Sequence, residues 1–353
     1  MYSSIDPDWF YNRTNSTEGG GSEAFYTMSV VVLFIIVFIG TFGNSIVILI
    51  ILLHRDMRTV TNYFVLNLAI TDIAMLIICD MPTGIVLAKN TPSWPLGDLM
   101  CRLIGYTMNV TVQATCLTLT AMTIDRYFLI VHAVRSRNTR TTRRAALFNI
   151  GIWLFSVVVH VPVLVFNKTE ESESGNLECD RNFGWNHGNL IYYLFIVLAM
   201  YVVPLSIIMF CYIQILYQVW HKTSAGTESA QANARSLRRK KKITRMVFIV
   251  VFLFALCWAP MHTINLWLYS DSDHYNNHVK SEVYTLCLGL AYANSCVNPF
   301  VYAFTTTSFK KYFKKFFWPC WRGKARENIS VSISMKTKSE RLTASQGKED
   351  SSI

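Results

Sequence analysis

Residues 28–53 read MSVVVLFIIVFIGTFGNSIVILIILL, a stretch without a single Asp, Glu, Lys or Arg. A helix rises about 1.5 Å per residue, so roughly 20 apolar residues are enough to cross the hydrocarbon core of a bilayer. Every backbone polar group in that core must be satisfied within the chain, and a helix achieves this within one segment. The stretch therefore predicts a membrane-spanning helix.

Six further apolar blocks follow the first, and each is long enough to span. They lie approximately at 62–88, 99–132, 143–166, 190–220, 241–269 and 281–304. The blocks are continuous and do not alternate between polar and apolar residues, which excludes a barrel of membrane strands. We expect an all-α membrane protein with a seven-transmembrane-helix bundle over residues 28–304.

The charges of the connecting segments predict the orientation. Lys and Arg concentrate in short cytoplasmic loops. One alternating set of connections is basic, as in the run Arg238–Lys242, and the other is acidic, as at Glu170 and Glu178. We expect a plasma-membrane protein with an extracellular N-terminus and a cytoplasmic C-terminus. The formal net charge of +11 then describes a basic face beside anionic lipid, and nucleic-acid binding is a poor explanation for it.

The segment 1–27 is expected to be extracellular and glycosylated. It has no apolar core preceded by basic residues, so we expect no cleavable signal peptide and the first helix acts as the insertion signal. The pattern Asn-x-Ser/Thr marks acceptors in this segment and in an outer loop. The expected glycosylation sites are Asn12, Asn15 and Asn167.

Three of the nine cysteines stand apart from those in apolar blocks, which we interpret as small buried hydrophobic residues. Cys101 begins the third block on the outer side and Cys179 lies in the acidic outer loop, both in the oxidising compartment. A disulfide between them would tie that loop across the mouth of the bundle. Cys320, on the inner side, is a predicted palmitoylation site.

Short motifs distinguish among the classes of protein that have seven helices, because transporters and proton pumps share that number. The motifs are Asp125-Arg126-Tyr127, Cys257-Trp258-Ala259-Pro260 and Asn298-Pro299-Phe300-Val301-Tyr302. Single residues at matching depth in other blocks are Asn44, Asp72, Trp153 and Pro204. In this order, over residues 28 to 320, they resemble the rhodopsin-like (class A) G-protein-coupled receptors.

The resemblance implies an activation switch. Arg126 would pair with Asp125 at rest and be released toward a G protein on activation. Pro260 removes a backbone hydrogen bond, so the sixth helix can bend there while Trp258 senses the ligand; simple packing is the alternative. The other expected members are Tyr127, Phe254, Asn298, Pro299 and Tyr302. Lys240 stands where relatives with a strong resting lock have a carboxylate, so we expect appreciable basal activity.

A carboxylate within a membrane helix is costly unless it is paired or faces water, which makes Asp72 a functional candidate. The resemblance implies an allosteric sodium ion held by oxygen ligands, which a hard cation prefers. The expected ligands are Asp72, Thr115, Asn294, Ser295 and Asn298. The alternative is a polar cluster that joins helices. No other cofactor is expected.

The C-terminal part divides in two. Residues 305–320 alternate aromatic pairs with lysine pairs, which predicts an amphipathic helix on the inner membrane surface. Residues 321–353 are rich in Ser and Thr without apolar periodicity, as in a disordered cytoplasmic tail that receptor kinases phosphorylate for arrestin. The ending Ser351-Ser352-Ile353 matches a ligand of PDZ proteins.

Two ligand classes are excluded by single positions. Tyr292, seven residues before Pro299, occupies the place of the Schiff-base lysine of a light receptor. Met108 stands where amine receptors have an aspartate. The acidic outer loops would attract a basic ligand large enough to contact several of them. These features favour a peptide.

Two segments, Trp94–Cys101 and Val110–Arg126, are similar to those of the kisspeptin receptors, with galanin and allatostatin-A receptors next. The resemblance implies a neuropeptide ligand with an amidated Arg-Phe or Arg-Tyr end, and Gq-family coupling with calcium release. Asp80, about 12 Å outward of Asp72, would bind the arginine; a carboxylate that reaches loop water is the alternative. The expected ligand residues are Asp80, Met108, Gln113, Met261, His262, Asn265 and Tyr292.

Pro82 follows Asp72 by ten residues, whereas the family more often spaces this pair by nine, so the second helix is expected to differ locally around Asp80.

Two other classes of protein are alternatives to a receptor, and the sequence favours neither. A transporter would show internal repeats with interrupted helices, and none is found. An intramembrane enzyme needs a nucleophile and a base, and neither His160 nor His262 has an evident nucleophile beside it.

Overall fold

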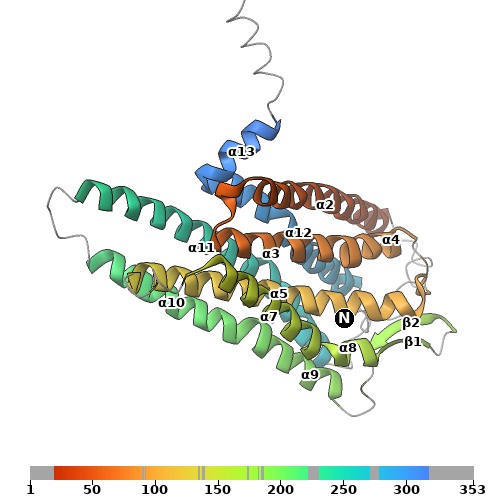
Figure 1. The fold of residues 1–353 in the computed structure, drawn as a ribbon. Helices are drawn as coiled ribbons and strands as arrows, with labels where there is room; N and C mark the ends of the chain where they lie inside the picture. The colour runs from red at the N-terminus through yellow and green to blue at the C-terminus, as the bar shows by residue number, and fades with distance from the viewer. Residues whose placement is uncertain are drawn as a thin grey trace, which may run out of the picture. The chain divides into compact units, whose positions relative to one another are not determined.

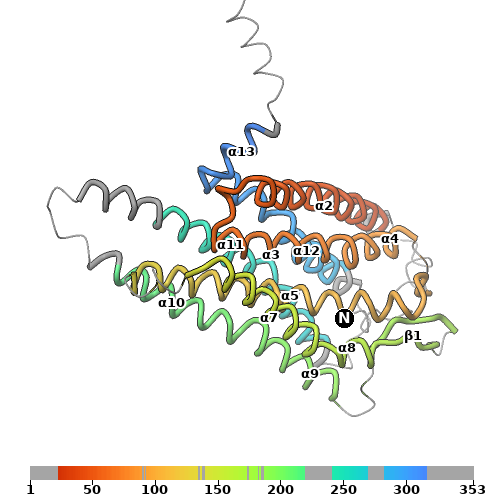
Figure 2. Tube along the Cα trace, viewed as in Figure 1, coloured from red at the N-terminus to blue at the C-terminus, as the bar shows by residue number. Residues whose placement is uncertain are grey.

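The structure is a computed structural model. It describes residues 20–89, 91, 93–133, 136, 140–172, 175–181, 183, 187–221, 230–270 and 278–317. Seven membrane helices follow one another within these residues, and three of them are built from more than one helical segment (Figure 1). Figure 2 traces the same path and shows α5 between α3 and α10, both of which it contacts.

The segments have these bounds. The first four membrane helices are α2 (Gly20–Leu53); α3 (Val60–Met75), the π-helical turn η2 (Leu76–Asp80) and α4 (Met81–Lys89); α5 (Gly97–Val131); and α7 (Thr142–Val159) with α8 (Val161–Phe166). The last three are α9 (Gly188–Val197), the π-helical turn η3 (Leu198–Val202) and α10 (Val203–His221); α11 (Ala230–Ser270); and α12 (His278–Thr305). A short 3-10 turn, η1 (Arg55–Met57), precedes α3.

The predicted blocks match the helices closely, with two extensions. The first helix begins at Gly20, not at residue 28, and the sixth begins at Ala230, not at residue 241. Hydropathy marks the part of a helix that lies in lipid, and helical hydrogen bonds continue past that boundary. Part of the segment predicted as an extracellular tail is therefore the first turns of α2.

The distribution of polarity is that of a membrane protein. Six of the helices are long and apolar enough to cross a bilayer on their own. The seventh, α12, carries several amides and hydroxyls, and it packs between α2 and α11. Large apolar side chains such as Phe38 and Phe304 are exposed, while Asn44 and Asp72 are buried. The lipid-facing surface is thus apolar, and polar groups are collected inside.

Buried side-chain amides connect the helices. Asn44 on α2 donates hydrogen bonds to the carbonyl oxygens of Gly40 at 3.0 Å and of Ser295 on α12 at 2.8 Å. Asn67 on α3 donates to the hydroxyl of Thr118 at 2.7 Å and accepts one from the indole of Trp153 at 2.8 Å. Asn44 and Trp153, which the motifs singled out, therefore hold helices together.

Prolines explain the local irregularities. Each π-helical turn is followed two residues later by a proline, Pro82 after η2 and Pro204 after η3. The fourth helix is divided at His160, two residues before Pro162. Proline lacks a backbone donor and its ring clashes with the preceding turn, so a wider turn or a break relieves the contact. Asp80 is the last residue of η2.

A β-hairpin lies beside the end of α5. Strands β1 (Asn167–Glu171) and β2 (Leu177–Arg181) pair antiparallel, with Thr169 opposite Cys179. The turn between them contains Gly175, whose φ of +76° favours glycine. Cys179 forms a disulfide with Cys101, and their Cα atoms are 5.5 Å apart. This confirms the predicted pairing.

The helix α13 (Thr307–Phe317) belongs to a separate unit and confirms that part of the predicted amphipathic helix is helical. Its sequence alternates aromatic and lysine pairs, so one face is apolar and the other basic. The predicted sites at Asn12, Asn15 and Cys320, the side chain of Lys240 and the Ser/Thr-rich tail lie outside the described residues.

The contact between α2 and α12 gives the first prediction. A Cβ atom on Gly43 would lie 3.0 Å from Cγ of Pro299, whose ring cannot move aside. Gly43→Val should therefore lower the melting temperature (Tm) of the purified protein by several degrees, as overpacking does. Gly151→Val is the matched control because no atom lies within 4 Å of its added Cβ. Equal effects of the two substitutions in a thermal unfolding assay would contradict this account.

Candidate functional site

Asp80 is the most unusual of the predicted ligand residues. Its side chain is 0% exposed, and neither carboxylate oxygen has a hydrogen-bond partner. Among the described residues it takes part in no ion pair. The alternative, a carboxylate that reaches loop water, does not fit a side chain this deeply buried. A buried carboxylate without a partner is costly, so this position favours a ligand that brings a cation.

Tyr292 joins the seventh helix to the region of Asp80. Its hydroxyl lies 3.1 Å from that of Thr83, which in turn donates to the carbonyl oxygen of Cys79 at 2.7 Å. Thr83 follows Asp80 by three residues, so the two lie on neighbouring turns of one helix face. The structure therefore brings Asp80 and Tyr292 into the same part of the bundle.

A cluster of rings surrounds His262 on α11. Its Nδ1 is 3.0 Å from the hydroxyl of Tyr193, and its ring centroid is 4.8 Å from that of Tyr201 and 5.9 Å from that of Trp258. Its Nε2 has no hydrogen-bond partner, and neither has Oδ1 of Asn265 one turn later. These two predicted ligand residues therefore retain unused polar atoms next to aromatic rings.

Three other predicted ligand residues are buried but are not all neighbours. Met261 is 0% exposed and lies beside His262 in the chain. Met108 and Gln113 on α5 are both buried. A helix turns about 100° per residue, so these two residues, five positions apart, face different neighbours. The sequence alone did not show that Met108 and Gln113 face different parts of the bundle.

Tyr201 is a site residue that the sequence reasoning missed. It lies in η3, and its hydroxyl donates a hydrogen bond to the carbonyl oxygen of Ala255 on α11 at 2.7 Å. Its ring centroid is 6.4 Å from that of Phe254, which is 6.3 Å from that of Trp258. The expected switch residues Phe254 and Trp258 are thus packed together, near Pro260 within α11. The only sequence feature that pointed to the region of Tyr201 was Pro204, three residues later.

The predicted sodium ligands are all buried, and one of them contacts Asp72 directly. The amide of Asn298 donates to Oδ2 of Asp72 at 2.9 Å, and Ser295, three residues earlier on α12, is buried as well. Thr115 instead donates to the hydroxyl of Thr71, at 3.2 Å. Asn294 is buried nearby on α12. Apart from Thr71, which the sequence reasoning missed, these are the oxygen-bearing residues that were predicted, and they suit a hard cation.

Asp125 holds two arginines at the opposite end of the bundle. Arg126, 1% exposed, donates to Oδ2 at 2.8 Å, as predicted. Arg140 donates from Nε to Oδ1 at 2.6 Å and from its terminal nitrogen to Oδ2 at 3.0 Å. Both arginines also hydrogen-bond to the hydroxyl of Thr61. In the sequence, Arg140 was one of several basic loop residues and nothing distinguished it.

The remaining members of the expected switch lie as follows. The hydroxyl of Tyr127 is 3.2 Å from Nε2 of His132. Pro299 packs against Gly43. Tyr302 is 0% exposed on α12.

The structure does not support Asn167 as a glycan acceptor. Its side chain is 3% exposed, and its Oδ1 accepts a hydrogen bond from Nε of Arg181 at 2.9 Å. Its amide nitrogen, the atom to which a glycan would be attached, faces Gly105. The Asn-x-Thr pattern at Asn167 cannot predict that the side chain is buried, because the burial arises from the folded hairpin.

Taken together, the seven helices, the disulfide-bound hairpin and the paired Asp-Arg motif define a multi-pass membrane receptor. The chain belongs to the rhodopsin family of 7 transmembrane receptors, whose family model matches residues 43–302. Its relatives are receptors and not enzymes.

Three relatives show the range of similarity. G-protein coupled receptor 54 of Oreochromis niloticus is 33% identical over 97% of this chain and 93% of its own. The KiSS-1 receptor of Homo sapiens is 34% identical over 78% of this chain and 71% of its own. Somatostatin receptor type 2 of Mus musculus is 31% identical over 86% of this chain and 80% of its own.

The role of Arg140 gives the second prediction. Because Arg140 shares both Asp125 oxygens, its removal leaves the carboxylate to Arg126 alone and holds that side chain more firmly. Arg140→Gln should therefore lower basal nucleotide exchange on a panel of heterotrimeric G proteins, at matched receptor amounts. Arg143→Gln, which removes an exposed arginine three residues away, is the control. A rise in basal exchange would show that Arg140 restrains the resting state instead.

Proposed function

We propose that the chain is a G-protein-coupled receptor for an extracellular neuropeptide with a basic residue near an amidated aromatic end, of the kisspeptin-like Arg-Phe or Arg-Tyr kind. It signals through heterotrimeric G proteins of the Gq family with release of calcium. The similarity to the KiSS-1 receptor and to G-protein coupled receptor 54 supports this proposal. The observation that carries it is the buried, unpaired carboxylate of Asp80.

The chemistry of Asp80 selects a cation. Arginine keeps its charge at all physiological pH values, and its planar donors match a carboxylate in a two-bond arrangement. A peptide arginine that enters the bundle would supply the counter-charge that Asp80 lacks. Such a charge-assisted pair is strong because little water competes for it in a buried site.

The aromatic end of the peptide has a matching environment. Tyr292 is tied to Thr83 beside Asp80, and His262 lies against Trp258 and Tyr201. Ring–ring contacts of this kind prefer offset or edge-on packing at centroid distances of about 4.5–7 Å. An adjacent Arg-aromatic pair would thus bring a cation to Asp80 and a ring to the cluster that contacts Trp258.

The orientation belongs to the same proposal. A disulfide between Cys101 and Cys179 persists in an oxidising compartment, which supports a hairpin and an N-terminus outside the cell. The other end carries Arg126 and Arg140, and a basic face inside the cell follows the charge rule for membrane proteins. G proteins, receptor kinases, arrestin and a PDZ protein would bind on that side.

An allosteric sodium ion completes the proposal. Asp72 is 1% exposed and forms no ion pair among the described residues, so its charge has only hydrogen-bond donors to compensate it. Asp72, Ser295, Asn298 and Thr115 would hold the ion, with Asn294 beside them. Bound sodium would supply the missing positive charge at the centre of the bundle.

A peptide screen gives the third prediction. Cells that express the chain should release calcium in response to amidated peptides ending in Arg-Phe or Arg-Tyr, and less to the same peptides with a free carboxyl end. Galanin-, allatostatin-A- and somatostatin-type peptides are tested in parallel with calcium and cyclic-AMP readouts, since the similarity to a somatostatin receptor is almost as high. Silence toward every peptide, with intact surface expression, would overturn the peptide proposal.

Asp80 gives the fourth prediction. Asp80→Asn should raise the half-maximal concentration of an arginine-bearing peptide by about 30-fold or more, because loss of a buried charge partner costs about 2 kcal/mol or more. The response to the same peptide with citrulline in place of arginine should change far less. Glu171→Gln, which neutralises an exposed acid of the hairpin, is the control. Unchanged potency in the Asp80 variant would remove this residue from the binding site.

The sodium ion gives the fifth prediction. The Tm of the purified receptor should rise in sodium chloride relative to potassium or choline chloride, because a ligand that binds only the folded state stabilises it. Asp72→Asn should abolish the difference, whereas Asp80→Asn should keep it. Equal values in the three salts for the unaltered chain would show that Asp72, Ser295 and Asn298 form only a hydrogen-bonded cluster.

A further inference from the structure

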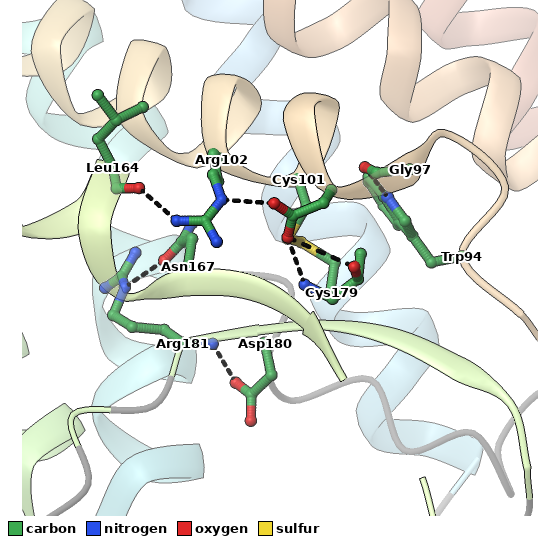
Figure 3. The surroundings of a disulfide bond; sticks show 11 residues. Trp94, Gly97, Cys101, Arg102, Leu164, Asn167, Cys179, Asp180 and Arg181 are labelled. Carbon is green, nitrogen blue, oxygen red and sulfur yellow. Dashed lines mark hydrogen bonds and ion pairs between the residues drawn. A yellow bond between two sulfur atoms is a disulfide. The ribbon is translucent and has the colours of Figure 1, made fainter. Parts of the chain in front are cut away.

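Arg181, the last residue of β2, is a buried cation. Its side chain is 2% exposed, and its Nε donates to Oδ1 of Asn167 at 2.9 Å (Figure 3). Its guanidinium lies 5.5 Å from the ring centroid of Tyr192 on α9. One of its terminal nitrogens has no hydrogen-bond partner. Arginine cannot give up its proton in proteins, so this position carries a permanent positive charge.

No carboxylate compensates this charge in the part of the chain that the structure describes. Arg181 takes part in none of its ion pairs. The neighbouring Asp180 accepts a hydrogen bond from the backbone nitrogen of Arg181, and its carboxylate points away from the guanidinium (Figure 3). A buried charge without a counter-charge is strongly unfavourable. The guanidinium therefore favours an anion from outside the chain.

Other groups with unused hydrogen-bonding capacity belong to the same region. The hydroxyl of Tyr192 has no hydrogen-bond partner, and neither ring nitrogen of His160 has one although that residue is 1% exposed. The ring of Tyr192 faces the guanidinium of Arg181, and His160 directly precedes α8, which leads into β1 at Asn167 opposite Arg181. A hydroxyl and an imidazole can each donate a hydrogen bond. Together with the free guanidinium nitrogen they form a set of donors suited to an anion.

The site is held in place by several elements. His160 lies at the break between α7 and α8, and Asn167 lies directly opposite Arg181 in the hairpin. The disulfide fixes β2 two residues before Arg181. Gly105 on α5 makes room for Asn167, because a Cβ atom there would clash with its amide nitrogen. Arg181 is thus positioned before any ligand arrives.

We propose that Arg181, Tyr192 and His160 form a binding site for one small monovalent anion. Its source is either chloride from the surrounding solution or a carboxylate group carried by a ligand. The anion would link the end of the hairpin to the fourth and fifth helices. This site is distinct from Asp80, whose charge selects a cation, and the test of it needs no peptide.

The test measures the Tm of the full purified chain in lipid nanodiscs without peptide or G protein. Sodium chloride, sodium acetate and sodium isethionate are compared at equal sodium concentration, so that any binding of sodium near Asp72 is the same in all three salts. Isethionate is the reference because its sulfonate is bulkier than chloride or a carboxylate. We expect a saturable rise of a few degrees in chloride or acetate.

Substitutions assign the effect to this site. Arg181→Gln should abolish the rise, and Arg102→Gln should keep it, because Arg102 is an arginine of the same end already paired with Asp98 at 2.6 Å. Tyr192→Phe retains the ring but removes one donor, so it should raise the half-maximal anion concentration several-fold. This milder variant keeps the proposal testable where Arg181→Gln does not fold.

The outcomes separate the two sources. A rise in chloride supports an ion from solution, and a rise in acetate alone supports a carboxylate of a ligand. Equal Tm values in the three salts, or a rise that persists at full size in both Arg181→Gln and Tyr192→Phe, would overturn the proposal. Because no peptide is present, failure here is distinguishable from failure of the peptide screen.

Discussion

The absence of water from the hydrocarbon core is the constraint on which the rest of this structure depends. Polar groups inside the bundle must find partners in the protein, and most do: Asn44 bonds to α12 and Asn67 joins α3, α5 and α7. Several charged or titratable exceptions lie in the half that carries the disulfide, at Asp80, Arg181 and His160, and Nε of Arg126 is one at the other end. The same constraint that stabilises the fold thus identifies the places where ligands can bind.

The sequence predicted those features that depend on composition and on order along the chain. Long apolar blocks require helices, and two cysteines at one end of the bundle are available to pair. It also identified the partners Asp72 with Asn298 and Asp125 with Arg126, through motifs. The contacts of Arg140 and Tyr201 could not be predicted from the sequence, because they arise from a loop conformation and from a π-helical turn. The glycosylation site expected at Asn167 was inferred from a three-residue pattern, which cannot predict that the amide is buried.

The two π-helical turns show how one additional residue in a helix changes the direction of the side chains near it. Ten residues separate Asp72 from Pro82, and the wide turn η2 lies between them. It accommodates an additional residue without breaking the helix, and it shifts the following side chains around the axis. Asp80 consequently lies inside the bundle instead of facing lipid. In the fifth helix, η3 likewise directs Tyr201 toward α11. Prolines that would disrupt a soluble helix here set the direction of the side chains of Asp80 and Tyr201.

The hydrogen bond from Tyr201 to Ala255 has a consequence for the timing of the receptor's response. Ala255 precedes Pro260 in α11, so the bond restrains the part of that helix nearer to the Asp125–Arg126 pair. Such a bond contributes about 1 kcal/mol net, which corresponds to a roughly fivefold bias between two conformations. If it must break before α11 swings, it slows opening by up to the same factor. Two receptors with equal affinity could then differ in how quickly they respond.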